Sequence, residues 1–134
     1  MSIASTIAVS GLAVASLRLQ VSANNVANAL TSGPLPGSAN SAGYPAAYVP
    51  ERVNQIDIAG GGTSASIGTI SPSYVSTYDQ AAPYADSNGF VASPNVDLAT
   101  ELVQQLVARY TFAANAHVVR ADAQMTSALF DALA

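Results

Sequence analysis

Few residues in this chain of 134 could carry out catalysis. His117 is the only histidine and there is no cysteine, so neither a Ser/His/Asp nor a Cys/His arrangement is indicated. The eight carboxylates are dispersed, and no pair is spaced for acid–base work or for a metal cage. The three glycines at 60–62 lack the Gly-Lys-Ser/Thr that completes a phosphate loop. The sequence therefore gives no positive reason to expect an enzyme, a metal, a cofactor or a small-molecule substrate.

Three asparagines within five residues, Asn24, Asn25 and Asn28, are the most conspicuous hydrogen-bonding groups. Asparagine is a mediocre helix former, so their density needs a reason. One reason is that Asn tolerates the left-handed conformation in which helices end. Another is that an amide both donates and accepts, and Asn24 and Asn28, one turn apart, could bond to a neighbouring helix. From chemistry alone, both interpretations stay open.

The segment that carries them, residues 2–31, has one charge, Arg18, and no proline. Its apolar residues form two stripes at helical spacing, which predicts a helix over about 3–29, roughly 40 Å long, that is buried on more than one side. One stripe runs through Ile3, Ile7, Val14, Leu17 and Val21, and the other through Ala8, Leu12, Ala15, Leu19, Ala23, Val26 and Leu30. A small domain alone would not cover this surface.

The same segment shares features with a targeting signal and with a membrane span. No Lys or Arg precedes residues 3–15, Ser and Gly dilute them, and the apolar pattern continues past Ala15. Arg18 and Gln20 interrupt the run of about 20 apolar residues that a span needs. We therefore expect a helix of the mature protein.

Residues 32–96 are dense in glycine and proline, which excludes long helices. Short strands are expected at 48–58 and 64–70, joined by the triple glycine as a hairpin tip, with a further extended piece at 73–78. Five of the six tyrosines fall in this segment. They could form a stacking platform for sugars or bases, but packing in a small sheet is the usual role of Tyr in strands and is favoured here.

Helix returns at 97–133, where Asn95 or Asp97 can cap its start and two apolar seams follow a coiled-coil alternation. One seam contains Val103, Val107, Tyr110, Ala114, Val118, Ala121, Met125 and Ala128, and the other contains Phe112, Ala116, Val119, Ala123, Thr126, Phe130 and Leu133. The predicted fold is α+β: terminal helices (1–31 and 97–134) that pack together in a coiled-coil-like manner, with a small β-rich insert and extended connector (32–96) between them.

The charge content is the clearest compositional signal. Only 9% of residues are charged, against about 25% in typical soluble domains, and there is no lysine. A net charge of −4 with four scattered arginines argues against a nucleic-acid partner. So few charges favour a subunit that is covered within an assembly.

Three segments carry a resemblance to a known family. The run from Ser10-Gly11-Leu12 to Ala23-Asn24-Asn25-Val26-Ala27-Asn28 resembles the N-terminal signature of bacterial flagellar axial proteins. The stretch 83–97 is similar to a segment typical of proximal basal-body rod proteins. Phe112-Ala113-Ala114-Asn115 with 121–125 is similar to the closing helix of the same superfamily.

This resemblance implies a structural subunit of the flagellar basal-body rod, a hollow shaft that transmits torque and passes later export substrates. It implies as partners copies of the same chain and other rod subunits, with inner-membrane ring and export-gate proteins nearby. It also implies a place in the periplasmic part of the rod and type III export without a cleaved signal peptide. The alternative from another class is a secreted carbohydrate- or surface-binding module that uses the tyrosine-rich middle.

Two residue sets are expected to carry this function. The subunit-interface set comprises Ile7, Leu12, Leu19, Asn24, Asn25, Val26, Asn28, Val107, Tyr110, Asn115, Val118 and Met125. The connector motif comprises Asp86, Asn88, Gly89, Pro94, Asn95 and Val96.

Overall fold

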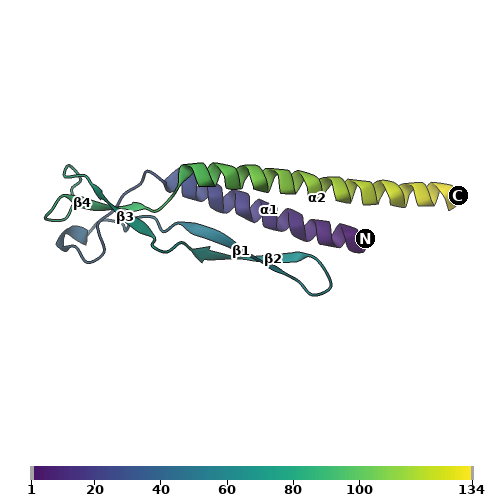
Figure 1. Cartoon of the computed structure of the whole chain (residues 1–134), viewed down its shortest axis with the longest axis horizontal. Coiled ribbons are helices and arrows are strands. Elements are labelled where there is room, and N and C mark those ends of the chain that lie inside the picture. Colours follow the sequence, from purple (N-terminus) through teal and green to yellow (C-terminus); the bar gives the residue numbers. More distant parts are fainter. Residues whose placement is uncertain (1, 134) are drawn as a thin grey trace.

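The computed structural model describes residues 2–133, and two long helices dominate it (Figure 1). Helix α1 is Ile3–Asn28 and helix α2 is Leu98–Leu133. They lie side by side and antiparallel, so that both chain ends point the same way. The ends of both helices agree with the predicted ranges, about 3–29 and 97–133, to within one residue.

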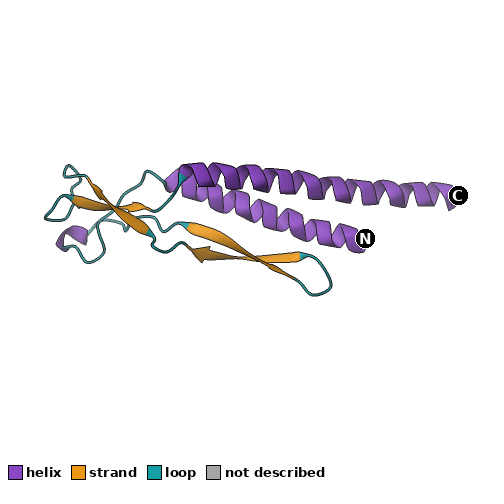
Figure 2. Cartoon of the chain, in the orientation of Figure 1, coloured by secondary structure: helices purple, strands orange, loops and turns teal. Residues whose placement is uncertain are grey.

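Between the helices lie four strands and one short 3-10 helix (Figure 2). The bounds are η1 Ala39–Ser41, β1 Glu51–Asp57, β2 Thr63–Thr69, β3 Tyr74–Tyr78 and β4 Phe90–Pro94. Strands β1 and β2 pair antiparallel, and β3 pairs antiparallel with β4. The two pairs are separate two-stranded sheets.

The β1–β2 hairpin lies along α1, whereas β3–β4 lies beyond the end of the helix pair that is remote from both termini (Figure 1). Helix α1 therefore contacts α2 with one face and the hairpin with another. This explains the two apolar stripes of α1: it is the central element of the molecule. Its buried apolar residues, Ala8, Val14, Ala15 and Val21, form half of the hydrophobic core.

The hairpin tip contains the triple glycine, as expected, and it turns back onto α1. Gly60, Gly61 and Gly62 all have φ near +100°, which L side chains rarely adopt. A Cβ on Gly61 would lie 2.7 Å from Ile7 Cδ1. The Ser10 hydroxyl accepts a hydrogen bond from the Thr63 amide at 3.1 Å, and Arg18 donates to Gln55 at 2.7 Å. These contacts fasten the hairpin along the helix.

The predicted β-rich insert between the two helices is confirmed, and it consists of two separate strand pairs. Strand β4 lies where the sequence predicts an extended connector, so this strand was not predicted. The first strand is also shorter than the predicted 48–58: it starts after Pro50, which has no amide hydrogen for a ladder.

Candidate functional site: the terminal helix pair

The contact between α1 and α2 is made by small and polar residues. On α1, Ala8, Ala15 and Ser22 are each 1–2% exposed and recur every seven residues. On α2, Glu101 and Ala108 are buried at the same spacing. The next two members of the series, Asn115 and Asp122, also face α1. A repeat of seven keeps one stripe of each helix against its partner. We call these residues the inner seam.

Gly11 allows the helices to approach closely at the middle of the inner seam. A Cβ at this position would lie 2.7–2.8 Å from the amide atoms of Asn115. Glycine costs about 1 kcal/mol relative to alanine within a helix. Here it provides the space that the Asn115 side chain occupies.

Asn25 is the most constrained polar side chain of the pair, at 1% exposed. Its amide nitrogen donates to Glu101 Oε1 at 2.6 Å and to the Glu51 carbonyl at 2.8 Å. Its oxygen accepts from the Tyr48 hydroxyl and from the Glu51 amide, each at 3.0 Å. Every hydrogen-bonding position of the amide is therefore used. This cluster, the Asn25 network, joins α1, the start of β1 and the first turn of α2.

Two further groups belong to this network. The Ser22 hydroxyl donates to the Glu101 carbonyl at 3.1 Å. Burial raises the pKa of the Tyr48 hydroxyl, and the nearby Glu51 and Glu101 carboxylates raise it further. The tyrosine therefore remains a neutral hydrogen-bond donor to Asn25 over the physiological range.

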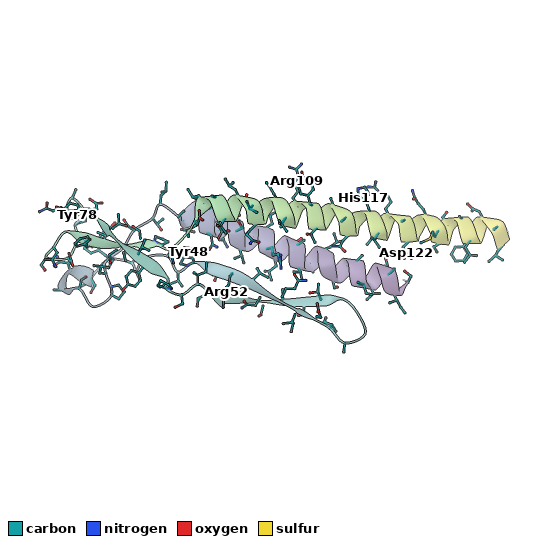
Figure 3. All side chains as sticks on the ribbon, in the orientation of Figure 1. Tyr48, Arg52, Tyr78, Arg109, His117 and Asp122 are labelled. Atoms are coloured by element: carbon teal, nitrogen blue, oxygen red, sulfur yellow. The ribbon has the colours of Figure 1, made fainter. Side chains whose placement is uncertain are left out.

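Asp122 is the last residue of the inner seam and lies beside Ser2 and Ser5 at the start of α1. Figure 3 shows it on the side of α2 nearest to the start of α1, whereas Arg109 and His117 project from the opposite side. A hydrogen bond from the Ser2 side chain lowers the pKa of the Asp122 carboxyl, and Ser5 adds to the effect. A negative charge at this point also complements the dipole of α1.

The predicted interface residues divide into three groups. Six apolar or aromatic side chains are at least 39% exposed in the single chain: Ile7, Leu19, Val107, Tyr110, Val118 and Met125. Asn24 is exposed, and Leu12, Val26, Asn28 and Asn115 are half-buried. Asn25 alone is fully buried.

The sequence analysis placed Asn25 in the subunit-interface set, and this prediction needs a correction. The structure shows that all four of its hydrogen bonds lie within the chain. Asn28 has a helix-end role: its amide donates to the Asn24 carbonyl, and its own carbonyl accepts from the Thr31 hydroxyl. Asn25 therefore bonds within the chain, Asn28 bonds at the end of α1, and the Asn24 side chain is exposed.

The connector motif builds β4 and leads into α2. The Asp86 carboxylate accepts from the amides of Asn88 and Phe90, at 2.9 and 2.8 Å, and so closes the turn before β4. Gly89 has φ +81°, and a Cβ there would lie 2.8 Å from the Tyr78 ring. The Asn95 amide donates to the Pro72 carbonyl at 2.9 Å, while Pro94 ends the strand and is buried.

Val96 completes the motif with a backbone bond to the Pro94 carbonyl. Asp97 then caps α2: its two carboxylate oxygens accept from the Ala99 amide and the Thr100 hydroxyl. These hydrogen bonds lower the pKa of the Asp97 carboxyl, with Thr100 contributing most.

Four of the five tyrosines of the middle segment have side-chain partners within the chain. Tyr44 and Tyr84 pack with ring centroids 5.3 Å apart, and Tyr78 packs edge-on against Phe90 at 5.7 Å. Tyr84 also bonds to Ser32, across 2.7 Å. Packing, the favoured interpretation, accounts for them without a stacking platform.

The sequence analysis named Ala8, Ala15 and Asn115 but missed the other residues of the inner seam, which are Ser22, Glu101, Ala108 and Asp122. A usable signal was present, since Glu101, Ala108, Asn115 and Asp122 are spaced by seven, as are Ala8, Ala15 and Ser22. It was overlooked because the larger apolar residues of the same helices form more obvious seams.

Residues 2–133 also bear on two other kinds of site, a metal centre and a membrane span. This part of the chain contains no cluster of three or more side chains that could hold a metal ion. By length and composition α1 could cross a membrane, and it is the one helix of the described residues that meets this test. It contacts both α2 and the β1–β2 hairpin, while much of its remaining surface is exposed in the single chain.

Comparison with known proteins places this helix pair in a family. Residues 87–131 match the model for the C-terminal region of flagellar basal body rod FlgEFG proteins. The chain is 32% identical over 139 residues to the flagellar basal-body rod protein FlgC of Agrobacterium fabrum, covering 99% of this chain and 95% of the relative. It is 37% identical over 119 residues to FlgC of Salmonella typhimurium, covering 84% and 83% respectively.

These matches include both terminal helices and the insert, so the resemblance extends over the whole architecture. The secreted binding module receives no support from them. The chain belongs to the FlgC family of flagellar basal-body rod proteins and is a structural subunit of the rod.

Proposed function

We propose that the chain assembles through the outer faces of its terminal helices, on which large apolar side chains remain exposed. We use the term outer face for the large apolar side chains of α2 that stay exposed, which lie around much of the helix circumference: Leu98, Leu102, Val103, Leu106, Val107, Tyr110, Phe112, Val118, Met125, Leu129, Phe130 and Leu133, all at least 42% exposed. Monomeric proteins rarely expose contiguous apolar patches of more than a few hundred Å², and larger patches mark interaction sites. This exposure is the observation that carries the proposal.

The partners are copies of this chain and other rod subunits, because the relatives of the chain are named flagellar basal-body rod proteins. Inner-membrane ring and export-gate proteins are the expected neighbours at the base of the rod. Within the tube, each helix pair acts as a stiff strut: the Asn25 network and the inner seam fix it internally, while the outer face bonds it to its neighbours. Torque then passes between subunits by packing, with no catalytic step and no cofactor.

The proposal includes a periplasmic location and export without a cleaved signal peptide. Support comes from α1, because Ala8, Val14 and Ala15 are buried against the rest of the chain. Removal of residues up to 15 would uncover α2 and the hairpin tip together. The mass of the N-terminal peptide of the mature protein tests this point, and a start after Ala15 would refute it.

The assembly proposal is tested with Val118→Glu, which places a carboxylate on the outer face. A buried unpaired charge costs several kcal/mol, repeated in every copy. We expect the variant chain to be produced and exported but hook–basal bodies and swimming to be lost. Val118→Ile is the matched control and should swim normally. A motile Val118→Glu strain with intact basal bodies would show that this face is not an interface.

A further inference from the structure

Asn88 is the one asparagine of eight that is followed by glycine. In an Asn-Gly pair the backbone nitrogen of the glycine can attack the side-chain carbonyl carbon of the asparagine, because glycine has no Cβ to block the approach. The new C–N bond closes a succinimide ring, and the side-chain nitrogen leaves as ammonia with the proton of the backbone nitrogen. Water then opens the ring at either carbonyl carbon and yields aspartate or isoaspartate. The reaction needs water alone as co-reactant.

The surroundings of the Asn88 side chain favour this reaction. Residue 88 lies in the turn between β3 and β4, at the end of the molecule remote from both termini (Figure 1). The side chain is exposed, and within residues 2–133 its amide makes no hydrogen bond. It is therefore free to turn toward the backbone of Gly89.

The backbone of the same turn opposes the reaction. Asp86 Oδ1 accepts hydrogen bonds from the amides of Asn88 and Phe90, at 2.9 and 2.8 Å. The Gly89 amide, which contains the attacking nitrogen, donates to the Asp86 carbonyl at 3.0 Å. Gly89 is also buried, and a Cβ there would lie 2.8 Å from the Tyr78 ring. Attack therefore requires the turn to open, so that the nitrogen loses its hydrogen bond and moves toward the side chain.

We infer that Asn88 is a site of spontaneous deamidation and that the Asp86 carboxylate limits its rate by holding the turn closed. Short exposed segments open locally without unfolding of the whole chain. The reaction proceeds from the open turn, so its rate follows the fraction of time for which the turn is open. Asp86 acts on the reaction as a positioning residue, through the backbone amides that it binds.

The product would alter the pairing of β3 with β4. In isoaspartate the main chain runs through the former side chain, which adds one methylene group before Gly89. The Gly89 carbonyl accepts from the Asp79 amide at 2.9 Å, and the next residue, Phe90, pairs with Tyr78. A longer backbone displaces Gly89 from this register. Deamidation at Asn88 would thus loosen the start of β4.

The test is incubation of the purified full-length chain at mildly alkaline pH, with aspartate and isoaspartate at position 88 quantified by peptide mapping. We expect Asp86→Ala to raise the rate about tenfold, because two amides lose their acceptor and the turn opens more often. Asp86→Asn is the matched variant: it keeps an acceptor oxygen and should react at a rate close to that of the wild type.

Two measurements on the wild-type chain complete the test. In urea the turn is lost, so position 88 should react at least as fast as in Asp86→Ala. Asn24 is the internal control in every sample, because it is exposed but lies within α1, whose backbone hydrogen bonds hold the following nitrogen. It should remain unmodified in the folded chain. Hydrogen exchange of the Gly89 amide should be slower than in urea, which reports the closed turn without any substitution.

The outcomes address the two parts of the inference separately. Absence of aspartate and isoaspartate at position 88, even in urea, would overturn the assignment of a modification site. Equal rates in the wild type, in Asp86→Ala and in urea would overturn the role of Asp86, as would a Gly89 amide that exchanges as fast in the folded chain as in urea. All these measurements use the single chain, so none depends on assembly.

Discussion

The two sides of α2 carry different kinds of side chain. The side that faces α1 carries Glu101, Ala108 and Asn115, which are small or polar, whereas the outer side carries large residues such as Leu106, Val107 and Tyr110. Small residues let two helices approach closely, and polar ones fix a single register through hydrogen bonds. Contacts within the chain therefore specify the register and spacing of α1 and α2, while most of the apolar surface of α2 is left for contacts between chains.

The largest effect on the isolated chain should come from Asn25→Asp. This change replaces the amide donor by a carboxylate next to the buried Glu101 carboxylate, and it removes the hydrogen bond to the Glu51 carbonyl. We expect a loss of about 3 kcal/mol in the free energy of unfolding at neutral pH, measured in urea. The loss should shrink in acid, where one of the two carboxyls takes a proton.

Asn24→Asp is the matched control, because Asn24 is exposed one position earlier in the same helix. Its free energy of unfolding should stay within about 0.5 kcal/mol of the wild-type value. If Asn25→Asp were as harmless as this control, the Asn25 network would not determine how the inner side of the pair is built.

A smaller effect is expected from Gly11→Val. The added side chain would meet the Asn115 amide, so the helices must separate locally, at a cost of about 1–3 kcal/mol. The cost should fall by about 1 kcal/mol when Asn115 is also changed to Ala, because that change makes room. A double-mutant cycle by urea unfolding measures this coupling, and strict additivity would contradict a direct contact between the two positions.

The pH dependence of stability should reveal the cap of α2. The pKa of Asp97 is lowered in the folded chain, so its carboxylate stabilises the fold above the ordinary Asp pKa. That contribution is lost as the pH falls through the lowered value. Asp97→Asn keeps the capping oxygen but cannot titrate, and its unfolding free energy should vary less over the acid range. If the unfolding free energies of the wild-type and Asp97→Asn proteins varied identically with pH, this role for Asp97 would be ruled out.

The smallest effect on the isolated chain is expected from the outer side. Val107 is 45% exposed, so Val107→Ser should change the unfolding free energy by about 0.5 kcal/mol or less. The same change should reduce the yield of basal bodies, counted by electron microscopy. A large loss of stability without a loss of assembly would reverse the assigned roles of the two sides.

The sequence predicted the helices well because their signals are local and repeated. Unbroken apolar periodicity and the Gly/Pro-rich middle placed α1 and α2 to within one residue, and the triple glycine placed the turn between β1 and β2. Strand β4 was not found, because Gly89 and Pro94 mark loops in a local interpretation. Its identity as a strand depends on pairing with β3 and on the Asp86 turn.

The inner seam could not be found by searching for large apolar residues. That search selects the side of α2 with the strongest hydrophobic periodicity, and here this side faces outward. Likewise, an asparagine that caps a helix, one that bonds within the chain and one that bonds between subunits look alike in sequence. Only the positions of Glu51, Glu101 and Tyr48 in space reveal what Asn25 does.

The Asn25 network also constrains the order in which the chain folds. It connects α1 with Glu101, 76 residues later, so a loop of that size must close before the network forms. An N-terminal portion by itself has neither Glu101 nor Ala108 to pack against. Alone, a helix of 26 residues gains little tertiary stabilisation. The native helix pair can therefore form only once Glu101 and the α2 residues that follow it are available to pack against α1.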